Sequence, residues 1–211
     1  MRLRARAKRV TLRSVESYLS SRFDELDALS SAGHPWGFLA GCTILDFLAS
    51  LEAGTASTNR IFKKFCSDFL FKTRPEYCAA IYTSLKGNGR PILLVNQLYH
   101  VLRCGITHGF SMSPVPHPAT HPDANPVARS LLLAHNNSGL VHLKRVEHTN
   151  GLDAYVLISE MFARDVRDAA SLLFKSARRR DADGTRRKHA ILTHFAKYPP
   201  LGWTEYIVTK A

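Results

Sequence analysis

The sequence predicts a mainly α-helical fold: an antiparallel bundle of about five helices, followed by a small antiparallel β-sheet and a C-terminal helix. Apolar residues recur every three to four positions through most of the first 110 residues, the spacing of a helix with one buried face. Beyond residue 128 the period becomes two or the apolar run is continuous, which is typical of strands. At 211 residues and 45% hydrophobic content, the chain is long enough for one domain with a substantial core.

The first three helices follow from their patterns and caps. A helix is predicted over residues 11–31, and Gly33, His34 and Pro35 end it. The next, over residues 36–51, is apolar almost all round, as in a helix at the centre of a bundle. Its only charge, Asp46, is interpreted as a structural ion pair or cap contact. Gly54 ends this helix, and Ser57 or Thr58 caps a third.

Two further helices are expected before residue 110. A fourth begins near Pro75, carries Tyr77, Ile81 and Leu85, and ends at the Gly87-Asn88-Gly89 turn. The fifth covers residues 91–110, with the sequence PILLVNQLYHVLRCGITHGF. One stripe of this helix is apolar, and a second is polar and consists of Asn96, His100, Arg103 and Thr107.

The remainder of the chain is expected to pack on the bundle within one domain. Residues 111–128 form a proline-rich loop, whose His117 and His121 lack a helix to align them, so no metal site and no cofactor are predicted. Strand-like segments at 130–134, 140–146 and 154–158 predict the antiparallel sheet. Helix returns at residue 159 and is expected to break near Gly184. The three segments are therefore a bundle (1–110), a loop (111–128), and a sheet with C-terminal helices (129–211).

The net charge of +12 lies mainly in two tracts. One is the first nine residues and the other is residues 175–188, which favours a polyanionic partner such as RNA. The candidate nucleic-acid-binding residues are Arg178, Arg179, Arg180, Arg186, Arg187 and Lys188. The alternative is that both tracts are solvated tails and loops.

Localisation follows from what the sequence lacks. No charge-free apolar run reaches the roughly 18 residues of a membrane span, so we expect a cytoplasmic protein with no membrane partner. The basic N-terminus also resembles a transit peptide, although an exposed basic first turn is preferred. The four cysteines are widely spaced in apolar patterns and are expected to be buried, reduced thiols.

Arg103 and His108 are the candidate catalytic residues, near the end of the fifth helix. A guanidinium binds phosphate oxygens bidentately, and an imidazole can move a proton near neutral pH, so the pair suits RNA cleavage without a metal. On an ideal helix, five positions turn through about 500°, so the two side chains diverge by about 140°. They converge only if the helix loosens near Gly105 or if a second subunit completes the site.

The segment LYHVLRCGITHGF resembles the HEPN superfamily, whose motif is an arginine, four to six residues, and a histidine near the end of a late bundle helix. The resemblance covers residues 11–110 and implies a helical bundle, often a homodimer, with paired motifs lining a cleft. Active members are metal-independent endoribonucleases, frequently toxins or defence proteins with a neutralising partner. It assigns the motif positions to Arg103 and His108. The polar stripe of the fifth helix adds Asn96, His100 and Thr107 as supporting residues. The residue after the arginine is commonly polar but is Cys104 here, and inactive binding members also exist.

Three other interpretations stay open. Arg103 and His108 both suit the negative end of a helix dipole, and Arg103 could pair with Asp46 across the bundle. The protein could be a non-catalytic module that only binds a nucleic acid or a protein. A DNA-binding regulator is the third alternative, although no recognition helix rich in Asn, Gln and Arg is evident.

Overall fold

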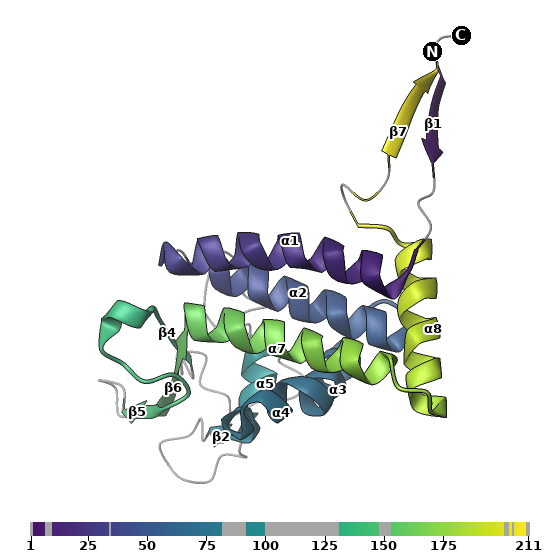
Figure 1. Cartoon of the computed structure of the whole chain (residues 1–211). Coiled ribbons are helices and arrows are strands. Elements are labelled where there is room, and N and C mark those ends of the chain that lie inside the picture. The colour runs from purple at the N-terminus through teal and green to yellow at the C-terminus, as the bar shows by residue number, and fades with distance from the viewer. Residues whose placement is uncertain are drawn as a thin grey trace, which may run out of the picture.

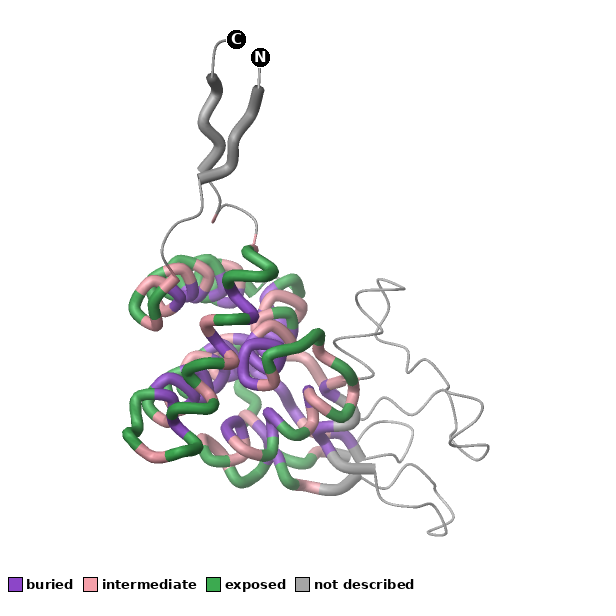
Figure 2. The backbone as a smooth tube through the Cα atoms, turned by 90° about the vertical axis from the view of Figure 1, so that its right-hand side faces the viewer, coloured by how far each residue is buried: buried purple, intermediate pink, exposed green. Residues whose placement is uncertain are grey.

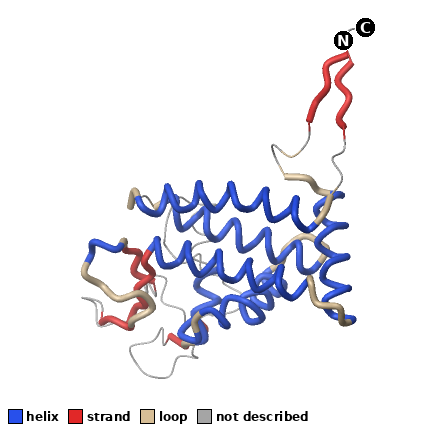
Figure 3. Tube along the Cα trace, viewed as in Figure 1, coloured by secondary structure: helices blue, strands red, loops and turns tan. Residues whose placement is uncertain are grey.

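The computed structural model describes residues 2–6, 10–33, 35–81, 92–99, 131–147, 153–200, 203 and 205–209. Three long helices lie side by side: α1 (Leu12–Ser31), α2 (Trp36–Ala53) and α7 (Ser159–Ala177) (Figure 1). The helix α8 (Ala182–Lys197) crosses one end of this layer, and a small sheet lies at the other (Figure 1). The mainly α-helical fold class is confirmed, and Figure 3 shows how helix dominates the described chain.

The ends of α1 and α2 are set by local chemistry. The Thr11 hydroxyl accepts a hydrogen bond from the Ser14 amide at 3.1 Å, and the Ser14 hydroxyl accepts one from the Thr11 amide. The two bonds together form a capping box. Gly54 ends α2 at φ 70°, in the left-handed region, and its N–H donates to the Ser50 carbonyl at 2.9 Å. These predicted boundaries are confirmed.

The helix α2 is the central core helix that the sequence predicts. Its length and mean hydropathy of 1.3 would suit a membrane span, yet 56% of the helix is buried inside the protein. It contacts α1, α3, α7 and α8, so its apolar surface faces other helices.

The predicted fourth helix is wrong. The helix α3 (Asn59–Phe65), capped by Thr58, runs through a π-helical turn (Cys66–Leu70) into α4 (Phe71–Thr73). Arg74 is then extended, as the residue before a proline prefers, and Pro75–Cys78 forms only a 3₁₀ turn, η2. The strand β2 (Ala80–Ile81) follows and pairs antiparallel with β3 (Ile92–Leu93).

The fifth helix begins later than predicted, because β3 occupies the residues after Pro91. The described part of this helix is α5 (Leu94–Gln97), whose first amide, that of Leu94, donates to the Ala79 carbonyl at 2.8 Å. The Gly87-Asn88-Gly89 turn and the proline-rich loop lie outside the described residues.

The sheet has three strands in the order β4-β6-β5: β4 (Leu131–Ala134), β6 (Asp153–Ile158) and β5 (Arg145–Glu147). The pair β5–β6 is antiparallel, as predicted, but β4 runs parallel to β6, so the sheet is mixed. The segment 140–144 is a turn, not a strand: Leu143 adopts φ 59° and its amide donates to the Val156 carbonyl at 2.7 Å.

The ends of the described chain meet in a two-stranded ribbon. The strand β1 (Arg2–Arg6) pairs antiparallel with β7 (Glu205–Thr209), and the ribbon projects away from the helices beyond α8 (Figure 1). The preferred basic first turn is therefore wrong. Trp203 packs edge-on against Phe195, with ring centroids 4.9 Å apart, and so lies on the bundle just before β7.

A single hydrophobic core joins the two halves of the sequence. It includes Leu19 of α1, Leu45 of α2, Phe62 of α3, Val166 of α7 and Phe195 of α8, all almost completely buried (Figure 2). The helix α7 contacts both α1 and α2, so the C-terminal helices complete the bundle. The expected break near Gly184 occurs instead at residues 178–181, and Gly184 lies in the first turn of α8, where its amide donates to Asp181 at 2.7 Å.

Candidate functional site

The segment that precedes the Arg-x4-His sequence is anchored in the core. Leu94, Val95 and Leu98 are buried, and the Tyr99 ring lies 5.4 Å from that of Phe62, centroid to centroid. Asn96 falls within α5. The other predicted site residues of this helix, His100, Arg103, Thr107 and His108, lie outside the described residues, so their predicted roles stay predictions.

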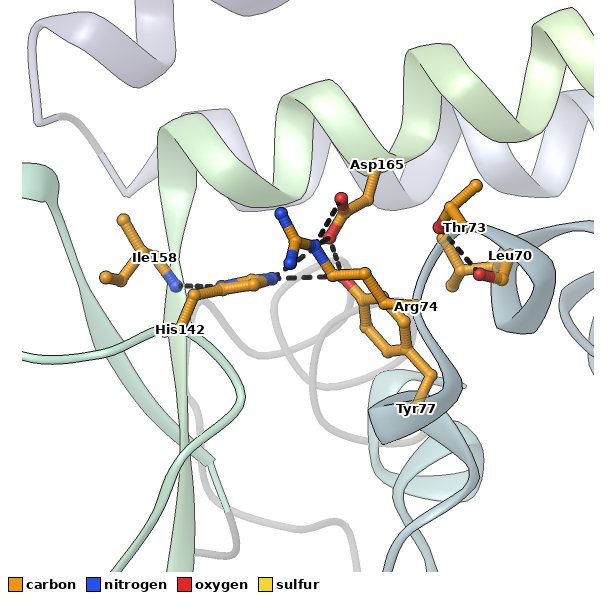
Figure 4. A network of polar contacts seen from close by, with 7 residues as sticks. All are labelled: Leu70, Thr73, Arg74, Tyr77, His142, Ile158 and Asp165. Carbon is orange, nitrogen blue, oxygen red and sulfur yellow. Dashed lines mark hydrogen bonds and ion pairs between the residues drawn. The ribbon is translucent and has the colours of Figure 1, made fainter.

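A buried polar cluster lies beside this anchored start. It consists of Arg74, Tyr77, His142 and Asp165, which come together from η2, from the turn before β5 and from α7 (Figure 4). The Asp165 side chain is 2% exposed. It accepts hydrogen bonds from Arg74 Nε at 2.8 Å, from the Tyr77 hydroxyl at 2.9 Å and from His142 Nε2 at 3.0 Å.

Local structure places each member of the cluster. Asp165 lies on the buried face of α7 together with Phe162, Val166 and Ala169. Arg74 and Tyr77 are three residues apart across the start of η2, so both can reach one acceptor. The turn at Leu143 directs His142 inward, and the Ile158 amide donates to His142 Nδ1 at 2.9 Å.

The protonation states in the cluster follow from these bonds. His142 Nδ1 accepts from a backbone amide, so the proton of the neutral ring is on Nε2 and points at Asp165. Burial, together with the neighbouring Asp165 carboxylate, raises the pKa of Tyr77, so its phenol remains a donor. The hydrogen bond to Asp165 raises the pKa of Arg74. Three donors therefore converge on one carboxylate.

These contacts limit what the cluster can do chemically. Both nitrogens of His142 are engaged and its side chain is 4% exposed, so it is not an available acid or base. Arg74 alone reaches solvent, with 30% of its side chain exposed. None of the four residues was predicted from the sequence, although one signal was present: a carboxylate interrupts the apolar stripe of α7 at Asp165.

The predicted basic surface is only partly available. Arg178 pairs with Glu16, and Arg179 pairs with Asp181. Arg186 and Arg187 both face the buried Glu52, at 3.7 and 3.4 Å. Arg187 is only 15% exposed and lies over the Phe69 ring. Arg180 and Lys188 are exposed, and no ion pair joins either of them to another residue of the described chain.

The cysteines differ from one another. Cys42 and Cys66 are buried and free, as expected, and burial raises the pKa of both thiols, with Asp46 adding to the effect. Cys78 is exposed, so the prediction of a buried thiol is wrong for this cysteine, and Cys104 lies outside the described residues.

Comparison with known proteins gives no relative: no family model, no curated protein and no solved structure matches this chain. Within the described ranges, no group of three or more His, Cys, Asp or Glu side chains could hold a metal ion.

Proposed function

We propose that this protein is HEPN-like and acts on RNA as a metal-independent endoribonuclease of the toxin or defence type. The observation that supports the proposal is the anchored start of α5 in a helical bundle. Leu94, Val95 and Leu98 fix the helix in the core, and the Arg-x4-His sequence follows four residues after Tyr99. A rigid base of this kind suits a catalytic pair that must hold its geometry.

The proposed chemistry is transfer within the RNA strand. His108 accepts the proton of a 2′-hydroxyl, and the 2′-oxygen attacks the adjacent phosphorus while the 5′-oxygen leaves and takes up a proton. Arg103 binds the non-bridging oxygens and stabilises their added charge. The products are a 2′,3′-cyclic phosphate and a free 5′-hydroxyl.

The proposed functional unit is a homodimer. Arg103 and His108 diverge by about 140° on an ideal helix, so two facing copies complete a site most simply. A protein of the toxin type also needs a neutralising protein partner.

The test is cleavage of a mixed-sequence RNA pool by the purified full chain in EDTA. Arg103→Ala and His108→Ala are expected to abolish cleavage at unchanged thermal stability. His189→Ala is the matched control, because His189 is exposed on α8, and it should cleave like the wild type. Equal cleavage by all four proteins would refute the proposal. RNA binding without cleavage by the wild type would favour the second candidate, a non-catalytic binding module, which the presence of Cys104 after the motif arginine supports.

A further inference from the structure

The buried polar cluster combines two features that are each unfavourable. Asp165 is a carboxylate at 2% exposure, and moving such a charge out of water costs several kcal/mol before its partners compensate. Leu143 is a non-glycine residue at φ 59°, a conformation that L residues seldom adopt. Both features serve the same arrangement, because the Leu143 turn brings the neighbouring His142 to Asp165. Features of this kind concentrate at functional sites.

The buried polar cluster holds the Arg74 side chain in one orientation. Arg74 Nε lies 2.8 and 3.0 Å from the two oxygens of Asp165, and Tyr77 and His142 both bond the second of these oxygens, Oδ2. Tyr77 is fully buried and His142 nearly so. The two terminal amino groups of Arg74 make no hydrogen bond to any residue in the described part of the chain, and the side chain is 30% exposed.

A guanidinium held through Nε keeps its outer edge available. That edge carries two parallel N–H donors at the spacing of two phosphate oxygens. Because Asp165 holds the side chain in place, little conformational freedom is lost when a ligand binds. The neighbouring carboxylate cancels the net charge, so recognition depends on the direction of the hydrogen bonds more than on long-range attraction.

The cluster is joined to the helix that leads into the Arg-x4-His motif. Arg74 and Tyr77 belong to the η2 turn, which contacts α5, and the Leu94 amide bonds to the Ala79 carbonyl directly after that turn. We infer that Arg74 is a phosphodiester-binding residue for the RNA strand, with Asp165, Tyr77 and His142 as its positioning residues. This inference rests on the proposed function, because it takes RNA as the ligand. A purely structural role for the Arg74–Asp165 ion pair would explain its buried side. It would give no role to the outer edge of Arg74.

The test is RNA binding, measured apart from cleavage. The probe is a fluorescein-labelled mixed-sequence 20-nucleotide RNA, and every variant carries His108→Ala so that the probe stays intact. Arg74→Gln and Arg74→Lys should each weaken binding about tenfold, since neither side chain can present two parallel N–H donors to a phosphate while it is bonded to Asp165. Arg164→Gln is the matched control, because this exposed arginine lies beside Asp165 in α7 and should change affinity less than twofold.

A second measurement excludes an effect through folding alone. In the ¹⁵N spectrum of the folded His108→Ala protein, the Arg74 side-chain resonances should shift when the RNA is added, while those of Arg164 should not. Unchanged Arg74 resonances, or an Arg74→Lys protein that binds like the Arg164→Gln control, would refute the inference. If cleavage depends on Arg103 and His108 but binding does not depend on Arg74, only this inference fails. If the wild type neither binds nor cleaves RNA, the proposed function fails with it.

Discussion

Replacing Asp165 with asparagine tests the buried polar cluster directly. The carboxylate accepts from three donors, two of which are buried: Tyr77 completely and His142 almost completely. An amide has one acceptor oxygen and turns an NH₂ group toward the donors on its other side. Breaking a buried ion pair costs about 3–5 kcal/mol, and partial hydration of Arg74 favours the lower end of that range. We therefore expect a loss of about 3 kcal/mol.

The assay is urea unfolding followed by far-UV circular dichroism at pH 7. Asp168→Asn is the matched control, because Asp168 is exposed on the same helix and its replacement should change stability by less than about 0.5 kcal/mol. Tyr77→Phe removes one donor and should cost about 1.5 kcal/mol. Its effect should shrink in the Asp165→Asn background, since the two side chains share a bond. Equal stabilities of Asp165→Asn and Asp168→Asn would show that the carboxylate is not a buried ion-pair partner.

Two further predictions concern α8. Burial lowers the pKa of His194 from 6.5, despite an opposing hydrogen bond that the imidazole donates to the Gly54 backbone. As the pH falls, the unfolded chain therefore binds the proton first. The stability from this residue is complete above about pH 6.5 and should fall as the pH drops toward the lower folded pKa. Melting temperatures at pH 7.5 and 5.0 should converge in His194→Gln relative to the exposed-site control His189→Gln, and an unchanged difference would contradict this. Neutralising Arg180 and Lys188 together should reduce the salt dependence of RNA binding and leave the stability of the protein unchanged. In contrast, Arg187→Met should lower the melting temperature, because Arg187 packs between Glu52 and Phe69. The reverse pattern would mean that Arg187 belongs to the binding surface.

The fold was predictable where one local rule decided the structure. The helix α1 has an apolar stripe, a threonine cap and a terminating glycine, and all three agree. The apolar α2 could be placed at the centre from composition alone. The prediction of the fourth helix is wrong because the spacing of Tyr77 and Ile81 fits a helix, while pairing between Ala80–Ile81 and Ile92–Leu93 makes a strand instead. The spacing of apolar residues within a short segment does not reveal a strand partner that lies elsewhere in the sequence.

The candidate site was less predictable for a related reason. Arg74, Tyr77, His142 and Asp165 come from three separated segments, so no spacing in the sequence connects them. Asp165 alone carried a signal, as a charge on an apolar face. The parallel pairing of β4 with β6 was likewise hidden, because strand patterns give the period and not the direction. The ribbon between β1 and β7 joins residues from opposite ends of the described chain.

The position of α7 has a consequence for how the protein is made. The ribosome releases α1 and α2 before α7 and α8, yet both of these later helices contact α1 and α2. Until residue 177 has emerged from the ribosome, part of the apolar surface of α2 is uncovered. A nascent chain in that state exposes hydrophobic surface, which chaperones bind. A gene fragment ending at residue 110 would leave the protein permanently in this condition. The bundle can therefore form completely only after α7 has been synthesised.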